Sequence, residues 1–84
     1  MGGGYKTHLN RERLKLAVRL GREVPYQEIA DAVGLNYMTV HRYATKTISR
    51  PDLDTVLKLA DYFGVPVEEF VFKEDKKGQL EAVV

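Results

Sequence analysis

The side chains best suited to binding chemistry lie close together in one short stretch, at Tyr37, Met38, His41 and Arg42. If this stretch is a helix, with about 100° of rotation per residue, these side chains share an arc of about 140° with Thr45. The arc is polar, aromatic and basic, and it carries no carboxylate. The apolar residues of the stretch lie outside the arc, so the core does not need these side chains and they are free to face a partner.

The distribution of charge indicates the kind of partner. The net charge is only +1, but residues 1–51 hold nine Lys or Arg and four Asp or Glu, a balance of +5. Residues 52–84 hold four basic and eight acidic residues, a balance of −4. No acidic residue lies between Asp31 and Asp52, an interval that contains the whole candidate face. This asymmetry predicts one surface that faces a polyanion and another that faces away from it.

Length and composition exclude several other classes of protein. The chain has 84 residues, enough for a single domain. It has no cysteine, which excludes disulfides, zinc–thiolate sites and cysteine nucleophiles. No apolar run approaches the roughly 18 residues that span a membrane, and the N-terminus lacks the apolar core of a signal peptide. We therefore expect a cytoplasmic protein with no membrane contact.

The sequence shows no motif for catalysis or for a cofactor. It contains no nucleophile paired with a base, no glycine-rich phosphate loop and no pair of carboxylates beside a plausible cleft. The histidines are His8 and His41, and no Asp or Glu stands three or four residues from His41. We expect a protein that is not an enzyme and that uses neither cofactor nor metal.

Hydrophobic spacing and capping residues predict an all-α fold. Asn10, Asn36 and Asp52 are placed to cap helix N-termini, and Phe70 is expected to be buried. Gly21, Gly34 and Gly64 follow the last apolar residues of three helices, where glycine commonly ends a helix. The predicted helices span residues 10–20, 26–33, 37–45, 53–63 and 67–71.

The first predicted helix has an unusually wide apolar arc, of about 200°. Two interpretations remain open. The helix packs on two sides inside a small bundle, which we favour, or Leu16 and Leu20 contribute to a dimer interface. The arc contains Leu9, Leu14, Leu16, Ala17, Val18 and Leu20.

The spacing around Gly34 predicts two helices that cross closely and steeply. Such a crossing needs a small residue at the contact, supplied by Ala30, and a turn residue that tolerates positive φ, supplied by Gly34. Leu35, Val40 and Tyr43 then close the small core from the other side. The residues expected to be structural are Ile29, Ala30, Val33, Gly34, Leu35, Val40 and Tyr43.

The stretches YQEIADAVGLNYMTVHRYATK and RPDLDTVLKLADYFGVPVEEF carry a resemblance to the lambda-repressor/Cro-type helix-turn-helix regulators, also called the xenobiotic-response-element family. The resemblance covers residues 9–72, with a flexible N-terminus at residues 1–8 and a C-terminal tail at residues 73–84. It implies a compact five-helix domain with the helix-turn-helix at helices two and three. It also implies a nucleoid-associated transcriptional regulator, a repressor, that binds a pseudo-palindromic double-stranded DNA operator as a homodimer.

The resemblance also implies roles for individual residues. Tyr37, Met38 and Arg42 match positions that contact bases, and His41 lies beside them, so these four form the expected base-reading set. A second set is expected at the DNA backbone, in part by position in the family and in part by adjacency. This set comprises Tyr26, Gln27, Asn36, Thr39, Thr45, Lys46 and Arg50.

Two positions depart from the family pattern. Tyr26 stands where Gln commonly braces phosphate and reading helix together, with Gln27 next to it. Thr45-Lys46 stands where Asn-Gly is frequent. Since lysine takes a left-handed conformation only with strain, we expect the loop after the reading helix to differ in shape.

The C-terminal tail has three open interpretations, and the function has two alternatives to repression. The tail fits a frayed end, a strand or hairpin turning at Asp75–Gly78, or a segment whose Leu80, Val83 and Val84 pack on a second copy. The functional alternatives are an antitoxin that binds DNA and a toxin, and a Cro-like module that docks protein.

Overall fold

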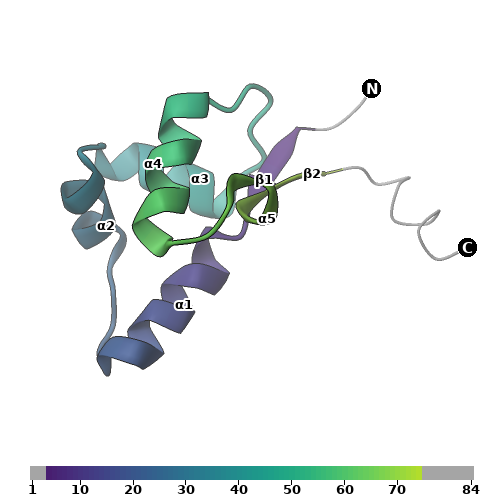
Figure 1. Ribbon diagram of the computed structural model, residues 1–84. Helices are drawn as coiled ribbons and strands as arrows, with labels where there is room; N and C mark the ends of the chain where they lie inside the picture. The colour runs from purple at the N-terminus through teal and green to yellow at the C-terminus, as the bar shows by residue number, and fades with distance from the viewer. Residues whose placement is uncertain (1–3, 75–84) are drawn as a thin grey trace, which may run out of the picture.

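The computed structural model of the protein describes residues 4–74. Within that range five helices surround one core, and two short strands pair beside α5 (Figure 1). The all-α, five-helix prediction is confirmed. The elements are β1 (Tyr5–Thr7), α1 (Leu9–Leu20), α2 (Tyr26–Val33), α3 (Tyr37–Thr45), α4 (Leu53–Phe63), α5 (Val67–Phe70) and β2 (Val71–Lys73). In the described part of the chain, no helix is long and apolar enough to cross a membrane.

Local capping explains why the helices begin where they do. The side chains of Asn36 and Asp52 accept hydrogen bonds from backbone amides three residues on, as expected, so α3 and α4 are capped. The prediction that Asn10 caps α1 is wrong, because the helix begins at Leu9 and the hydroxyl of Thr7 accepts from the Leu9 amide at 3.2 Å. The side chain of Asn10 is thereby left free to contact other helices.

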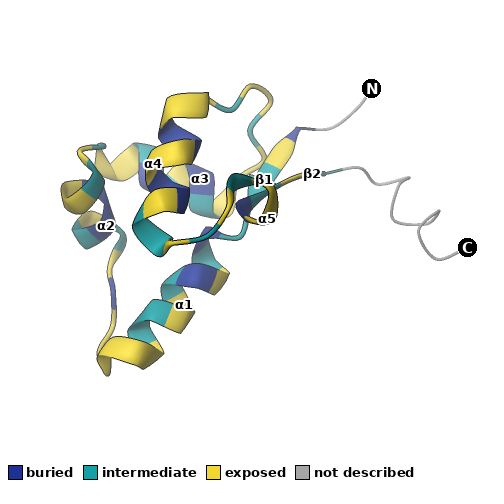
Figure 2. Cartoon of the chain, in the orientation of Figure 1, coloured by how far each residue is buried: buried dark blue, intermediate teal, exposed yellow. Residues whose placement is uncertain are grey.

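The core is a single apolar cluster at the meeting point of all five helices (Figure 2). Phe70 of α5 is fully buried, as predicted, and lies near Phe63 of α4 with 6.1 Å between ring centroids. Burial of these side chains supplies the main driving force for folding. The buried apolar residues are Leu9, Val24, Ile29, Ala30, Val40, Tyr43, Val56, Leu59, Ala60 and Phe70.

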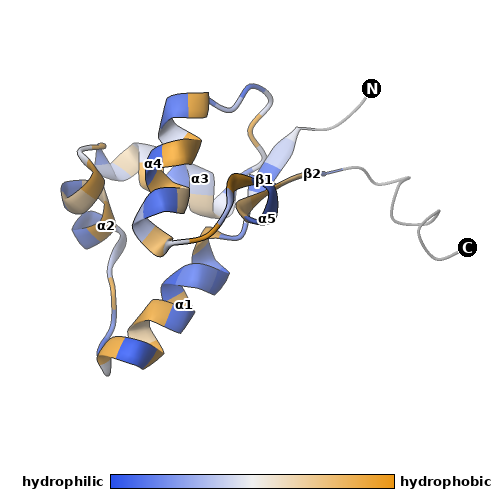
Figure 3. Cartoon of the chain, in the orientation of Figure 1, coloured by the Kyte–Doolittle hydropathy of each residue, from blue (hydrophilic) through white to orange (hydrophobic). Residues whose placement is uncertain are grey.

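The outer side of α1 remains uncovered. Leu14, Val18 and Leu20 expose 61%, 82% and 47% of their surface, so the favoured prediction of burial on two sides is wrong. Figure 1 shows why, since α1 projects from the bundle and no other described element covers its outer side. Exposed segments of its C-terminal half (Figure 2) are also hydrophobic (Figure 3). Leu16, by contrast, packs partly against the core.

Residues 5–7 near the N-terminus are part of the fold. We expected residues 1–8 to be flexible, but Tyr5–Thr7 form β1, which pairs antiparallel with β2 and places Tyr5 opposite Lys73. Tyr5 also bridges to Ile48 in the loop between α3 and α4. The boundary predicted between residues 72 and 73 falls inside β2. The predicted hairpin turn at Asp75–Gly78 and the packing of Leu80, Val83 and Val84 lie outside the described residues.

Replacing Tyr43 with Phe tests how α3 is anchored. Tyr43 is buried, and its hydroxyl accepts a hydrogen bond from the backbone amide of Asp52 at 2.8 Å, which ties α3 to the start of α4. Tyr43→Phe should lower the free energy of unfolding by about 1–2 kcal/mol, because it removes this bond. Thermal or denaturant unfolding measures the change. Tyr37→Phe is the matched control on the exposed side of α3, and an equal loss in both variants would contradict the assignment.

Candidate nucleic-acid interface

The turn between α2 and α3 has the geometry that the sequence predicted. Gly34 takes the left-handed conformation with φ of 76°, and the Leu35 amide donates to the Ala30 carbonyl at 2.9 Å. Ala30 and Val40 are completely buried on the two sides of the turn. The other predicted structural residues lie at the same contact, with Ile29 and Tyr43 buried and Val33 and Leu35 half-buried.

The predicted base-reading residues occupy the outer face of α3. Tyr37 and Met38 expose 41% and 66% of their surface, Arg42 is exposed and His41 is half-buried. Asn36 fixes the start of this face, because its side-chain oxygen accepts from the Thr39 amide at 3.0 Å and from the Thr39 hydroxyl at 3.3 Å. The face is therefore presented by a capped, rigid helix.

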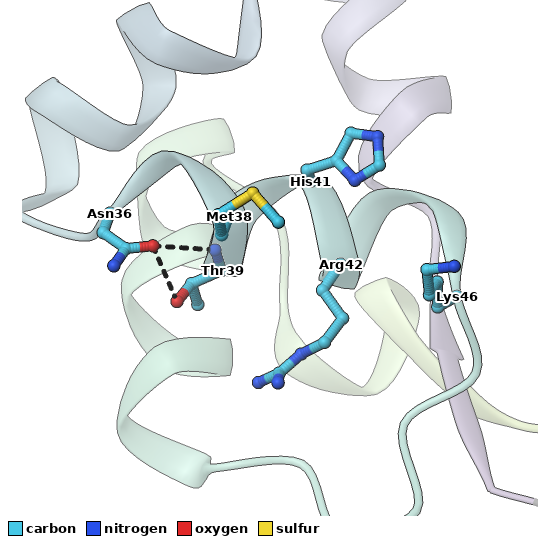
Figure 4. Close-up of a pocket in the computed structure, with 6 residues that line it drawn as sticks. All are labelled: Asn36, Met38, Thr39, His41, Arg42 and Lys46. Atoms are coloured by element: carbon cyan, nitrogen blue, oxygen red, sulfur yellow. Dashed lines mark hydrogen bonds between the residues drawn. The ribbon is translucent and has the colours of Figure 1, made fainter.

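An open hollow of about 240 Å³ lies along this face (Figure 4). In Figure 4, Met38, His41 and Arg42 point outward in different directions from α3. Three predicted base-reading residues and three predicted backbone contacts thus share one surface. The lining consists of Asn36, Met38, Thr39, His41, Arg42 and Lys46.

Tyr37, the fourth predicted base-reading residue, belongs to an aromatic cluster on the side of the face toward α2. Its ring stacks on His41, with centroids 5.9 Å apart, and lies 6.3 Å from the ring of Tyr26. The Tyr26 hydroxyl donates to the side chain of Asn10 at 2.9 Å. The Tyr26 hydroxyl is therefore directed at α1, and the phosphate contact expected for Tyr26 stays a prediction.

The other predicted backbone contacts are dispersed around the face. Thr45 donates its hydroxyl to the carbonyl of His41 at 2.8 Å, and Gln27 donates its amide to Asp31 at 2.9 Å. Lys46 and Arg50 are exposed and form no ion pair with any residue from 4 to 74. These two cations flank the end of α3 on the loop that follows it.

The loop after α3 begins without a left-handed residue. Lys46 has φ of −122°, in the extended region, so it avoids the left-handed conformation that the frequent Asn-Gly permits. No non-glycine residue of the described chain has a positive φ. The first residue of the loop is therefore unstrained and leads directly into extended backbone.

The carboxylates of α2 are held by side chains of their own neighbourhood. Glu28 accepts from the Arg22 guanidinium at 2.7 and 2.8 Å. This hydrogen bond lowers the pKa of Glu28 and raises that of Arg22, so both groups stay charged at neutral pH. Asp31 accepts from Gln27. The hollow on α3 has only cationic and neutral side chains in its lining.

Asn10 and Arg13 of α1 also belong to this surface, because their side chains lie against Tyr26. The sequence predicts a helix cap for Asn10 and no role for Arg13. Their contact with α2 joins residues 13 to 16 positions apart and depends on how the helices cross. Helical periodicity alone carries no signal for such a contact.

Two helices joined at a glycine turn, the second with an exposed polar face, define a helix-turn-helix domain. Residues 11–70 match the family model described as helix-turn-helix. The chain belongs to this family, and the lambda-repressor/Cro-type, or xenobiotic-response-element, assignment made from the sequence is confirmed.

A relative of this chain is named as a transcriptional repressor. The chain is 39% identical over 54 residues to the cryptic phage CTXphi transcriptional repressor RstR of Vibrio cholerae. The match covers 64% of this chain and 48% of the relative, so the chain spans about half of that protein's length. No solved structure matches the chain.

Replacing Asn36 with Ala tests whether the cap holds the exposed face in place. The change should lower the free energy of unfolding by about 1 kcal/mol, because an orphan amide of the first turn of α3 loses its partner. Thermal unfolding and backbone chemical shifts of residues 37–40 report the effect. Asp52→Ala is the matched control, since it removes the same kind of cap from α4 and should leave those shifts unchanged. An Asn36→Ala variant as stable as the parent would refute the role of the cap.

Proposed function

We propose that the protein is a sequence-specific transcriptional regulator, a repressor, that reads the major groove of double-stranded DNA with α3. The observation that carries the proposal is the exposed face of α3, cationic and free of carboxylates, on a helix-turn-helix. The relative from Vibrio cholerae supports repression, since it is named a transcriptional repressor. That name favours repression over the antitoxin and protein-docking alternatives. Such a regulator acts at the nucleoid in the cytoplasm.

The dimensions and chemistry of the face suit the major groove. The groove of B-DNA, about 12 Å wide, admits an α-helix. The Arg42 guanidinium fits the O6 and N7 acceptors of guanine in a two-point contact. Met38 and the Thr39 methyl fit the thymine methyl group, the apolar feature of the groove. Together these side chains favour a site that contains both guanine and thymine.

Phosphate contacts would set the position of the helix. Lys46 and Arg50 supply positive charge beyond the end of α3, and such contacts fix register without reading sequence. Gln27 and Asn36 add side-chain amide protons for such contacts, whereas the one proton of the Thr45 hydroxyl is donated to the His41 carbonyl. If each protomer neutralises about three to four phosphates, the log–log dependence of dimer binding on salt has a slope on the order of −6.

Replacing Arg42 with Ala tests the proposal. A random-sequence duplex library first yields the motif that the parent protein selects. Arg42→Ala should weaken binding to that motif by about 5- to 150-fold, the factor that a lost two-point guanine contact implies. Its binding to bulk DNA should fall far less. Gel shifts on both DNAs measure the two affinities.

Arg19→Ala is the charge-matched control for this experiment. Arg19 is exposed near the C-terminal end of α1, which points away from α3 (Figure 1). Its removal should leave discrimination between motif and bulk DNA intact. If Arg42→Ala changed neither affinity, the role assigned to Arg42 would fail. If the parent selected no motif at all, the proposed function would fail.

The proposed regulator acts as a homodimer on a pseudo-palindromic operator. Two copies of a helix-turn-helix read half-sites about one helical turn apart, so their symmetry matches that of the operator. The uncovered Leu14 and Val18 of α1 and the apolar residues of the tail are the candidate contact surfaces. We expect the tail to strengthen self-association.

Removing residues 75–84 tests this interface and leaves β2 intact. The shortened chain should show a smaller dimer fraction than the parent at equal concentration, because Leu80, Val83 and Val84 are lost. Sedimentation velocity measures the fraction. The double variant Leu14→Glu/Val18→Glu, in the full chain, is the parallel control on α1. An unchanged dimer fraction after truncation would contradict the tail assignment and place the interface on the helices. The Leu14→Glu/Val18→Glu variant tests that location.

A further inference from the structure

Three aromatic rings meet on the side of α3 that faces α2. Tyr26 lies edge-on to His41, with centroids 5.6 Å apart and planes at 83°. His41 stacks on Tyr37 at 5.9 Å and 29°, and Tyr37 lies 6.3 Å from Tyr26. All three separations fall in the range where aromatic pairs attract. Each ring therefore contacts both others, and two of the three belong to the proposed base-reading set.

Tyr26 also contacts two residues of α1. Its hydroxyl donates to the Asn10 side-chain oxygen at 2.9 Å, and the Arg13 guanidinium carbon lies 4.6 Å from its ring centroid. Arg13 is fixed in turn, since it donates to the same Asn10 oxygen at 3.1 Å and to the Val24 carbonyl at 3.0 Å. The Tyr26 ring is thus clamped between a fixed cation on α1 and the rings of α3.

We propose that Tyr26 is a positioning residue for sequence recognition: it orders the side chains of Tyr37 and His41 and links them to α1 through Asn10 and Arg13. This inference rests on the proposed function of α3. It differs from a phosphate contact, because a hydroxyl has one proton to donate and that of Tyr26 is used by Asn10.

The physical consequence of this ordering is preorganisation. Tyr37 and His41 stand four residues apart on one face of a helix and would otherwise sample several rotamers there. Ordering exposed side chains at the moment of binding opposes association. With Tyr26 in place, that ordering has occurred in the free protein. Removal of its ring should therefore reduce the preference for the correct sequence more than it reduces attraction to DNA in general.

Tyr26→Leu and Tyr26→Phe separate the ring from the hydroxyl. The probes are the motif that the parent selects from a random duplex library and an unrelated duplex of equal length. Tyr26→Leu should lower the preference for the motif by about tenfold, as expected when one or two side chains must be ordered on binding. Tyr26→Phe keeps all ring contacts and should keep the preference within about twofold of the parent. Tyr5→Leu, on β1, is the control for loss of a tyrosine elsewhere.

Ring signals in NMR spectra provide a readout independent of DNA. The chain has two histidines, and His8 stacks on Phe72 at 4.6 Å, outside the cluster, which makes it an internal reference. Tyr26→Leu should shift the ring protons of His41, since they lose the ring current of Tyr26, and leave those of His8 in place. Unfolding curves for each variant confirm that the fold is retained.

The outcomes distinguish the inference from its alternatives. A uniform loss of affinity for both duplexes in Tyr26→Phe, with the preference retained, would show a phosphate contact and overturn the inference. So would an unchanged preference or unchanged His41 signals in Tyr26→Leu. If Tyr26→Leu does not fold, Arg13→Ala removes the α1 cation that lies over the Tyr26 ring and leaves the three rings in place. A preference unaffected by that loss would overturn the link to α1. Failure of the parent to select a motif would instead refute the proposed function.

Discussion

Close contact between α2 and α3 is the constraint on which the rest of the structure depends. Ala30 is completely buried at the crossing, where a longer side chain would push the helices apart, and Gly34 makes the turn with a backbone conformation that other residues rarely adopt. Because the crossing fixes the direction of α3, it also decides which side chains are exposed. Val40 and Tyr43 of α3 face inward, and Met38 and Arg42 remain outside.

Hydrogen bonds hold both ends of α3. Of the outward side chains of α3, Thr39 takes part in these bonds. Asn36 holds the first turn, and the Thr7 hydroxyl donates to the Tyr43 carbonyl at 2.7 Å near the last turn. Tyr43 also reaches α4 through Asp52. The residues that fix α3 are therefore distinct from the proposed base-reading residues. The outward residues of a helix held in this way can change without loss of the fold.

The parts of the fold that were predictable are those encoded by neighbouring residues. The bounds of α2, α3 and α4 were predicted correctly, since Asn36, Asp52, Gly34 and Gly64 mark their ends locally. The β1–β2 pair was missed, because three-residue strands some 65 positions apart leave no periodic signal. The clamp on Tyr26 and the uncovered side of α1 were missed for a related reason. Both depend on how helices are placed relative to one another, and amphipathic patterns specify a face without naming its neighbour.

The strand pair has a mechanical consequence. The amide of Glu74 donates to the carbonyl of Gly4 at 2.8 Å, so the two limits of the described chain meet beside the first rung of the ladder, Tyr5 opposite Lys73. Tension applied at these two points would separate the paired residues of β1 and β2 one after another. The pull would also reach the loop after α3, because Tyr5 exchanges backbone hydrogen bonds with Ile48 and the Thr47 hydroxyl donates to Glu74. A load at these two points is therefore shared between the strand pair and the C-terminal end of α3.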